Sequence, residues 1–273
     1  MPYLNIANQS ASCYDSISLF CCIVPFEEEI VTLLRTIAAF AYTVFSLVCY
    51  LIVGIPAFIL SIVGFKKLMT LVVYRMGQLW GLGVVAITGC APVVQGREHI
   101  PKTGSVCFVS NHAGAFDIIL ALAYIGRPFG FIAKKELLLV PMLNIWIYLL
   151  GGLFIDRKNI RKAIGTINMG IKKIQNGNGM LIFPEGTRSK GRGLLPFRSG
   201  AIKLATHSLA PIVPIAISGS YEVFEKEYRV RPAPVRVTFC PPIVTAEMSP
   251  DDRRHKLTDQ VRDAIEAALA DGK

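Results

Sequence analysis

The chain has 273 residues, of which 52% are hydrophobic and 18% are charged, and its formal net charge is +10. Soluble domains usually carry about 25% charged residues, so this composition argues against an ordinary soluble domain and points to a membrane-associated segment. The basic excess suits anionic lipid headgroups or phosphorylated substrates. Zinc-ligand spacing, RNP-like aromatic runs and basic heptads are all missing, which argues against nucleic acid as a partner.

The seven cysteines are widely scattered and none belongs to a CxxC pair. An odd number at such spacing argues against a disulfide framework or a structural zinc site. A reducing, cytoplasmic setting for the basic C-terminal part of the chain is the simpler interpretation.

Residues 1–75 are expected to form a membrane-associated helical region, with four basic and four acidic side chains. The stretch Thr36–Phe65 contains no charged residue and exceeds the about 20 residues that a membrane span needs. Gly54 and Pro56 interrupt it. Either one tilted, kinked helix crosses the bilayer, or two shorter helices dip into one leaflet. Basic residues on both flanks favour the second arrangement slightly.

Residues 76–273 are expected to form one domain, because short apolar runs alternate with helical patterns. Isoleucines recur every three or four residues within Arg161–Gln175, and Ser249–Pro250 is a helix-start signal. Strands are predicted at Ser105–Ser110, Phe129–Ala133, Leu153–Ile155, Met180–Phe183, Ile212–Ile217 and Val235–Phe239. This alternation predicts an α/β fold, with a mixed, largely parallel sheet flanked by helices.

The most suggestive polar cluster runs from Asn111 to Asp117 and directly follows a predicted strand. Ligands usually bind at the carboxyl ends of such strands. If a helix starts there, Asp117 can orient the ring of His112, which leaves the second ring nitrogen free to accept a proton. Residue types alone give equal support to a capping asparagine beside a structural histidine.

A second cluster, from Phe183 to Ser189, also follows a strand. Arg188 is a natural partner for phosphate, and Gly186 and Thr187 expose backbone N–H groups to an anion. An ion pair between Glu185 and Arg188 that only shapes the turn is the alternative.

Two further basic residues are candidates for phosphate contacts. Arg157 follows the strand Leu153–Ile155, and Lys135 opens a predicted helix after Phe129–Ala133, where a cation can reach an anion near the helix start. Without other motifs, a structural Asp156–Arg157 pair explains the first position equally well, and a solvated lysine explains the second position better.

Together, the stretches NHAGAFD, GLFIDR, FPEGTRS and VPIAI resemble the four ordered motifs of the glycerolipid acyltransferase family, typified by 1-acylglycerol-3-phosphate acyltransferase. The resemblance extends from about Gly89 to Pro242, and the N-terminal part is similar only in being apolar. It implies that His112 is the general base and Asp117 its orienting carboxylate. It also implies that Glu185, Gly186 and Arg188 hold the glycerol phosphate. Asn111 and Thr187, which belong to the same two motifs, are expected to contact the substrate as well.

The family resemblance implies acyl transfer to the sn-2 hydroxyl of lysophosphatidic acid. The acyl donor would be acyl-CoA or acyl-carrier protein, and no metal or prosthetic group is expected. Other acceptors remain open: a lysophospholipid, an ornithine-type lyso-lipid or glycerol-3-phosphate. A non-catalytic membrane-remodelling protein is a different class. A soluble α/β hydrolase is a third, but it would need a GxSxG motif, which the sequence lacks. The expected location is the inner membrane, with the catalytic domain facing the cytoplasm.

Overall fold

The computed structural model describes the backbone of residues 7–271 and the side chains from Glu27 onward, except at positions 57, 60, 61, 199 and 254. Its strands are β1 (Val93–Gln95), β2 (Val106–Ser110), β3 (Phe129–Lys134), β4 (Leu153–Ile155), β5 (Gly179–Ile182), β6 (Ile212–Ser218) and β7 (Arg236–Phe239). Its helices are α1 (Ala7–Ile62), α2 (Lys66–Thr88), α3 (Phe116–Tyr124), α4 (Leu143–Leu149), α5 (Ile160–Gln175), α6 (Ser199–Ser208), α7 (Ser220–Val223), α8 (Pro250–His255) and α9 (Leu257–Ala270). Two short 3-10 helices, η1 (Arg97–His99) and η2 (Lys135–Leu139), complete the chain.

Within the described residues the strands form one sheet in the order β1-β7-β6-β2-β5-β3-β4. Neighbouring strands are parallel except β6 and β7, which pair antiparallel. The sheet is therefore mixed and largely parallel, as predicted. The predicted strands are confirmed to within a residue or two, whereas the three-residue edge strand β1 was not predicted.

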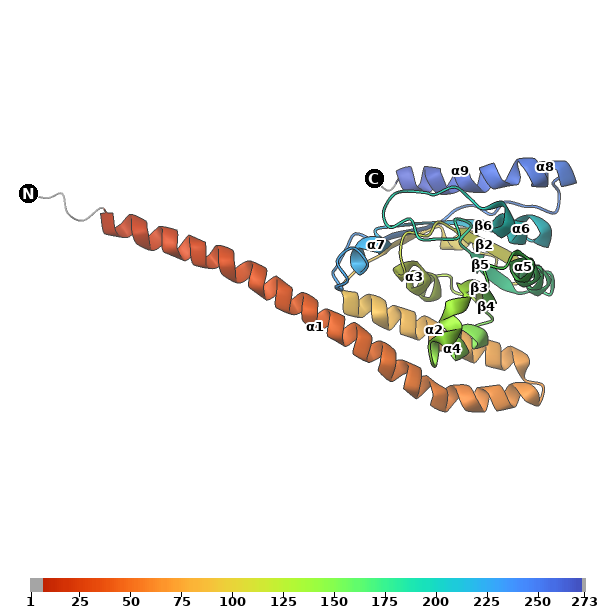
Figure 1. Ribbon diagram of the computed structural model, residues 1–273, viewed down its shortest axis with the longest axis horizontal. Coiled ribbons are helices and arrows are strands. Elements are labelled where there is room, and N and C mark those ends of the chain that lie inside the picture. Colours follow the sequence, from red (N-terminus) through yellow and green to blue (C-terminus); the bar gives the residue numbers. More distant parts are fainter. Residues whose placement is uncertain (1–6, 272–273) are drawn as a thin grey trace, which may run out of the picture.

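Successive side chains of each strand enter two different cores, because strand residues alternate between the faces of a sheet. In β2, Val106 and Phe108 pack with α2 and α3, while Cys107 and Val109 pack with α5, α6 and α9. Figure 1 shows these two helical layers on either side of the sheet. The C-terminal helix α9 buries Leu257, Val261 and Ile265 completely. The helix-start signal at Ser249–Pro250 opens the short helix α8, and a break at Lys256 separates α8 from α9.

The N-terminal region is a long helix, α1, followed by the returning helix α2 (Figure 1). Of the two arrangements expected for Thr36–Phe65, the two shorter helices do not form, because α1 continues through Gly54 and Pro56 as one helix and ends at Ile62. Pro56 lacks the N–H that would bond residue 52, which is a usual cause of a helix bend. Figure 1 shows α1 bending in its C-terminal part. The chain reverses at Gly64, whose φ of 111° suits glycine.

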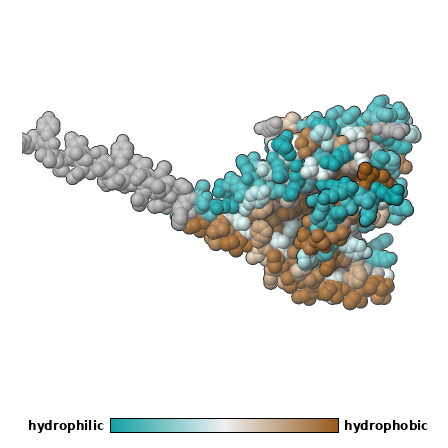
Figure 2. Space-filling view, in the orientation of Figure 1, coloured by the Kyte–Doolittle hydropathy of each residue, from teal (hydrophilic) through white to brown (hydrophobic). Residues whose placement is uncertain are grey.

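Two segments of this region, Glu27–Pro56 and Lys66–Thr88, are long and apolar enough to cross a membrane. Their apolar side chains are not all used for packing: Ile52 of the first segment is 72% exposed and Leu79 of the second is 61% exposed. Figure 2 shows hydrophobic side chains gathered over α1 and α2, away from a hydrophilic catalytic body. Such a large exposed apolar surface is typical of contact with lipid or another protein.

The packing of α2 against α3 joins the N-terminal region to the catalytic domain. A Cβ added to Gly81 would lie 3.0 Å from the carbonyl oxygen of Ile119 and 3.1 Å from the nitrogen of Ala123. The two helices therefore approach more closely than a larger side chain allows. The expected domain division between residues 75 and 76 lies inside α2.

We predict that Gly81→Leu lowers the free energy of unfolding by at least about 1–3 kcal/mol, the usual cost of overpacking. Gly165→Leu is the matched control, because Gly165 is also helical and nothing lies within 4 Å of its added Cβ. Thermal unfolding in detergent compares the two variants. Equal unfolding temperatures would contradict tight packing between α2 and α3.

Candidate active site

The two principal motifs meet because they follow adjacent parallel strands. Val109 of β2 is in register with Ile182 of β5, so the loops after both strands leave the same edge of the sheet. Backbone hydrogen bonds then join the loops. Ser189 N–H donates to His112 O over 2.7 Å, and Lys190 N–H donates to Ala113 O over 3.1 Å.

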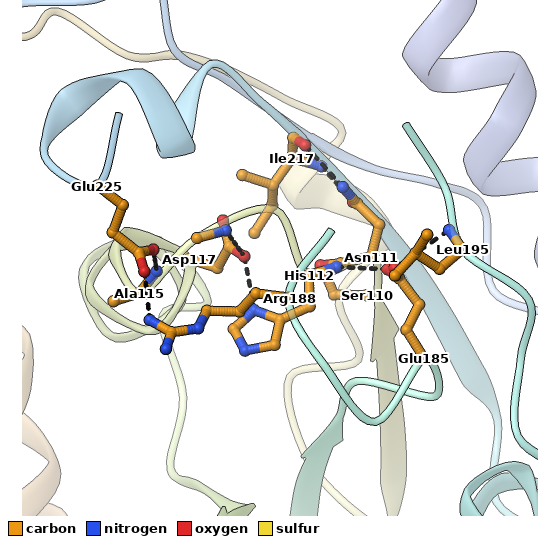
Figure 3. Close-up of polar contacts among 11 residues, drawn as sticks. Ser110, Asn111, His112, Ala115, Asp117, Glu185, Arg188, Leu195, Ile217 and Glu225 are labelled. Atoms are coloured by element: carbon orange, nitrogen blue, oxygen red, sulfur yellow. Dashed lines mark hydrogen bonds and ion pairs between the residues drawn. The ribbon is translucent and has the colours of Figure 1, made fainter. Parts of the chain in front are cut away.

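His112 is oriented by a buried carboxylate. Its Nδ1 lies 2.7 Å from Oδ2 of Asp117, which is fully buried in the first turn of α3 (Figure 3). An ionised carboxylate only accepts hydrogen bonds, so Nδ1 carries the hydrogen and Nε2 is left to accept a proton. Gly114 N–H also donates to Oδ2 over 3.0 Å, and the helix start favours the negative charge.

The imidazole of His112 also stacks on Phe183, with ring centroids 4.0 Å apart and planes inclined by 19°. This contact was not predicted, although Phe183 ends a predicted strand and is the first residue of the FPEGTRS motif. The ring is thereby held from its face by Phe183 and at its edge by Asp117.

Glu185 is 2% exposed and joins the two loops. Its Oε1 accepts the His112 N–H over 2.7 Å and its Oε2 accepts the Leu195 N–H over 3.1 Å (Figure 3). Burial raises the pKa of Glu185, and these two hydrogen bonds oppose that rise. Since both oxygens have backbone partners, Glu185 positions the site in this structure and makes no part of the cavity wall described below.

Asn111 likewise faces the backbone rather than the cavity. Its side-chain oxygen accepts the Ile217 N–H and its side-chain nitrogen donates to Ile217 O, both over 2.8 Å (Figure 3). The amide therefore ties the end of β2 to β6. Its substrate-binding role stays a prediction without a supporting contact.

A cavity of about 530 Å³ opens beside His112. Its wall is mainly apolar, with Ile118, Phe131, Ala133, Leu137, Leu143, Ile147, Ile155, Ile167, Ile182, Phe183 and Ala201 among its members. Lys134, Arg157 and Arg188 also line it, together with Gly186 and Thr187. The cavity can therefore hold an apolar chain next to the imidazole of His112 and three cationic side chains.

The two weaker candidates for phosphate contacts, Arg157 and Lys135, have different surroundings in the structure. Arg157 lines the cavity and donates to the carbonyl of Gly186, and burial lowers its pKa. Lys135 instead pairs with Asp156 over 2.7 Å, which raises the pKa of Lys135, and it is not part of the cavity wall. Its neighbour Lys134 occupies the wall instead.

Glu225 is a member of the site that the sequence did not reveal. One of its oxygens pairs with Nη1 of Arg188, and the other accepts the Ala115 N–H (Figure 3). It therefore connects both catalytic motifs. No recognisable motif surrounds it, so no sequence signal distinguished it from a surface acid.

Within the described side chains, no three His, Cys, Asp or Glu residues converge as metal ligands would.

We predict that Asn111→Ala lowers the free energy of unfolding by roughly 2–4 kcal/mol, because it leaves two buried backbone groups of Ile217 without partners. Asn168→Ala, at an exposed position of α5, is the control. Denaturant unfolding measures both variants. If Asn111 served substrate binding instead, its loss would raise a KM and leave stability unchanged.

Comparison with known proteins supports a common origin for this site. The sequence model of the Acyltransferase family matches residues 91–218. A 1-acyl-sn-glycerol-3-phosphate acyltransferase of Limnanthes douglasii is 37% identical over 69% of this chain and 67% of its own length. The enzyme of that name from Escherichia coli is 33% identical over 72% of this chain and 77% of its own length.

A solved structure has the same fold. The crystal structure of the 1-acyl-sn-glycerophosphate acyltransferase from Thermotoga maritima superposes with a TM-score of 0.77 and 25% sequence identity, covering 89% of this chain and 97% of that one. The chain therefore belongs to the family of 1-acyl-sn-glycerol-3-phosphate acyltransferases.

Proposed function

We propose that this protein transfers an acyl chain from acyl-CoA or acyl-carrier protein to the sn-2 hydroxyl of lysophosphatidic acid, with His112 as the general base. The observation that carries the proposal is the His112–Asp117 pair beside a mainly apolar cavity. Three basic side chains also line this cavity. The names of the relatives, which all specify this acceptor, support it.

The proposed reaction is a direct attack on the donor thioester. Nε2 of His112 removes the proton of the sn-2 hydroxyl as its oxygen attacks the thioester carbonyl. The new C–O bond forms, the C–S bond breaks, and the imidazolium returns the proton to the leaving thiolate. Asp117 keeps the ring in the required tautomer. Because the thioester is already activated, binding both substrates in the correct geometry supplies much of the rate.

Substrate placement follows from the two kinds of cavity wall. The apolar side chains suit a fatty acyl chain, and Arg188 is the cation of the FPEGTRS motif that lines the cavity. Its guanidinium offers paired donors for a phosphate. Arg157 holds the loop through Gly186 O and adds positive charge nearby.

We further infer that the protein lies at the inner membrane with its catalytic domain facing the cytoplasm. Leu139 and Tyr148, in η2 and α4, are 84% and 69% exposed, whereas Leu137 and Ile147 of the same elements line the cavity. Trp146 of α4 packs edge-on against Tyr50 of α1, with centroids 5.8 Å apart. This apolar surface continues that of α1, so the cavity would lie next to the bilayer, where a lipid acceptor enters.

The role of His112 predicts that His112→Ala lowers kcat by roughly 10²- to 10⁴-fold, the usual contribution of a general base. His207→Ala is the control, since His207 is exposed at the end of α6. Phosphatidic acid formation by detergent-purified protein, measured with each donor, gives the rates. Activity that survives in His112→Ala would remove His112 from the mechanism.

The proposed phosphate contact predicts that Arg188→Ala raises the KM for lysophosphatidic acid by about 10- to 100-fold, the value of one charged hydrogen bond. The KM for the acyl donor should stay near the wild-type value. Arg161→Ala, at an exposed position of α5, controls for loss of a positive charge. An unchanged acceptor KM would place the phosphate elsewhere.

A further inference from the structure

We propose that Glu225 is a positioning residue for acyl transfer, which orients Arg188 toward the acceptor phosphate and holds the start of α3. This inference rests on the proposed function, because it concerns the phosphate contact of Arg188. It assigns a role to a residue that lies outside all four motifs.

The two carboxylate oxygens of Glu225 have separate partners. One pairs with Nη1 of Arg188 and the other accepts the Ala115 N–H, the residue that precedes α3 (Figure 3). The Glu225 side chain is 12% exposed, whereas that of Arg188 is 43% exposed. The carboxylate is therefore enclosed on its own side, while the arginine remains accessible from the cavity.

The backbone around Glu225 is fixed from two directions. Toward the catalytic loop, a Cβ on Gly114 would lie 2.8 Å from the Glu225 carboxylate and 3.1 Å from Cα of Tyr221, so the segments touch closely. Toward the N-terminal region, the ring of Phe224 packs edge-on against Phe40 of α1, with centroids 5.8 Å apart. The carboxylate therefore has a defined place before any substrate arrives.

A second pair of contacts strengthens the attachment to α1. Val230 N–H donates to Oγ1 of Thr36 over 2.9 Å, and Arg229 pairs with Glu29 over 3.2 Å. The segment from Phe224 to Val230 thus spans the distance between α1 and the catalytic loops. Glu225 is the point at which this segment contacts Arg188.

The chemistry of arginine explains why such a carboxylate aids phosphate binding. A guanidinium has five N–H donors in a fixed plane, so Glu225 can hold one edge while another edge faces the phosphate. An unrestrained arginine would lose rotamer freedom on binding, whereas one already held by Glu225 loses less. Glu225 itself does not contact the phosphate, because two anions repel each other.

A purely structural ion pair would behave differently. It would change stability or the fraction of active protein, and thus the apparent kcat, without selecting one substrate. Orientation of Arg188 instead affects the acceptor KM and spares the donor KM. The effect should also disappear when Arg188 is absent, because Glu225 then has nothing to orient toward the phosphate.

The test is steady-state kinetics of the full chain in mixed micelles, with lysophosphatidic acid varied at saturating acyl donor. Glu225→Gln keeps the size of the side chain but loses its charge. Glu222→Gln is the matched control, because Glu222 is exposed three residues earlier. Arg188→Ala and the double variant Glu225→Gln/Arg188→Ala complete a cycle. Thermal unfolding checks folding, and Glu225→Asp replaces Glu225→Gln, with the same expected direction, should the latter not fold.

We expect Glu225→Gln to raise the acceptor KM roughly tenfold, the value of a weakened charged hydrogen bond. The donor KM and the Glu222→Gln kinetics should match wild type, and Glu225→Gln should cause no further rise in the Arg188→Ala background. An unchanged acceptor KM, or an equal rise in that background, would overturn the proposal while wild type remains active. A wild type that makes no phosphatidic acid would instead overturn the proposed function, and this inference with it.

Discussion

The buried carboxylate of Glu185 connects the two loops on which the site depends. Through backbone N–H groups it holds His112 at one oxygen and Leu195 at the other. A carboxylate taken out of water is costly unless it is hydrogen-bonded, so the loops must remain in contact to satisfy it. This constraint fixes the backbone of His112, and Asp117 and Phe183 then fix its ring. The packing of this loop also leaves no space for a side chain at position 186, since a Cβ on Gly186 would lie 2.8 Å from Cδ of Arg198.

The fold and the two catalytic loops were predictable because their signals are local. A run of apolar residues marks each strand, and polar residues directly after two such runs mark the edge where ligands bind. Asp117 reaches His112 because they are only five positions apart and a helix starts between them. An element boundary decides which of two neighbouring lysines faces the cavity. β3 continues through Lys134, so Lys134 reaches the cavity and Lys135 turns to Asp156.

Features that depend on distant segments were not predictable from one sequence. The pairing of Asn111 with Ile217 depends on how β2 and β6 align, and 106 positions separate the two residues. The contact of Glu225 with Ala115 spans 110 positions. The isoleucine stripe of α5 was only partly right: Ile167 and Ile174 are buried, but Ile164 is 53% exposed. Periodicity identifies the apolar face of a helix but not how far its neighbours cover it.

The N-terminal helices pack directly against the segments that form the candidate active site. Helix α1 contacts the body through Phe224 and through Trp146, and these residues lie on segments that border the site and the cavity. In the proposed reaction the acceptor and the product are both lipids, so a cavity wall that continues into the exposed apolar surface shortens their path.

The measurement that tests this account most directly is the product balance of purified wild-type protein given lysophosphatidic acid and an acyl thioester. The account predicts phosphatidic acid and free thiol in equal amounts, whereas free fatty acid without phosphatidic acid would contradict it.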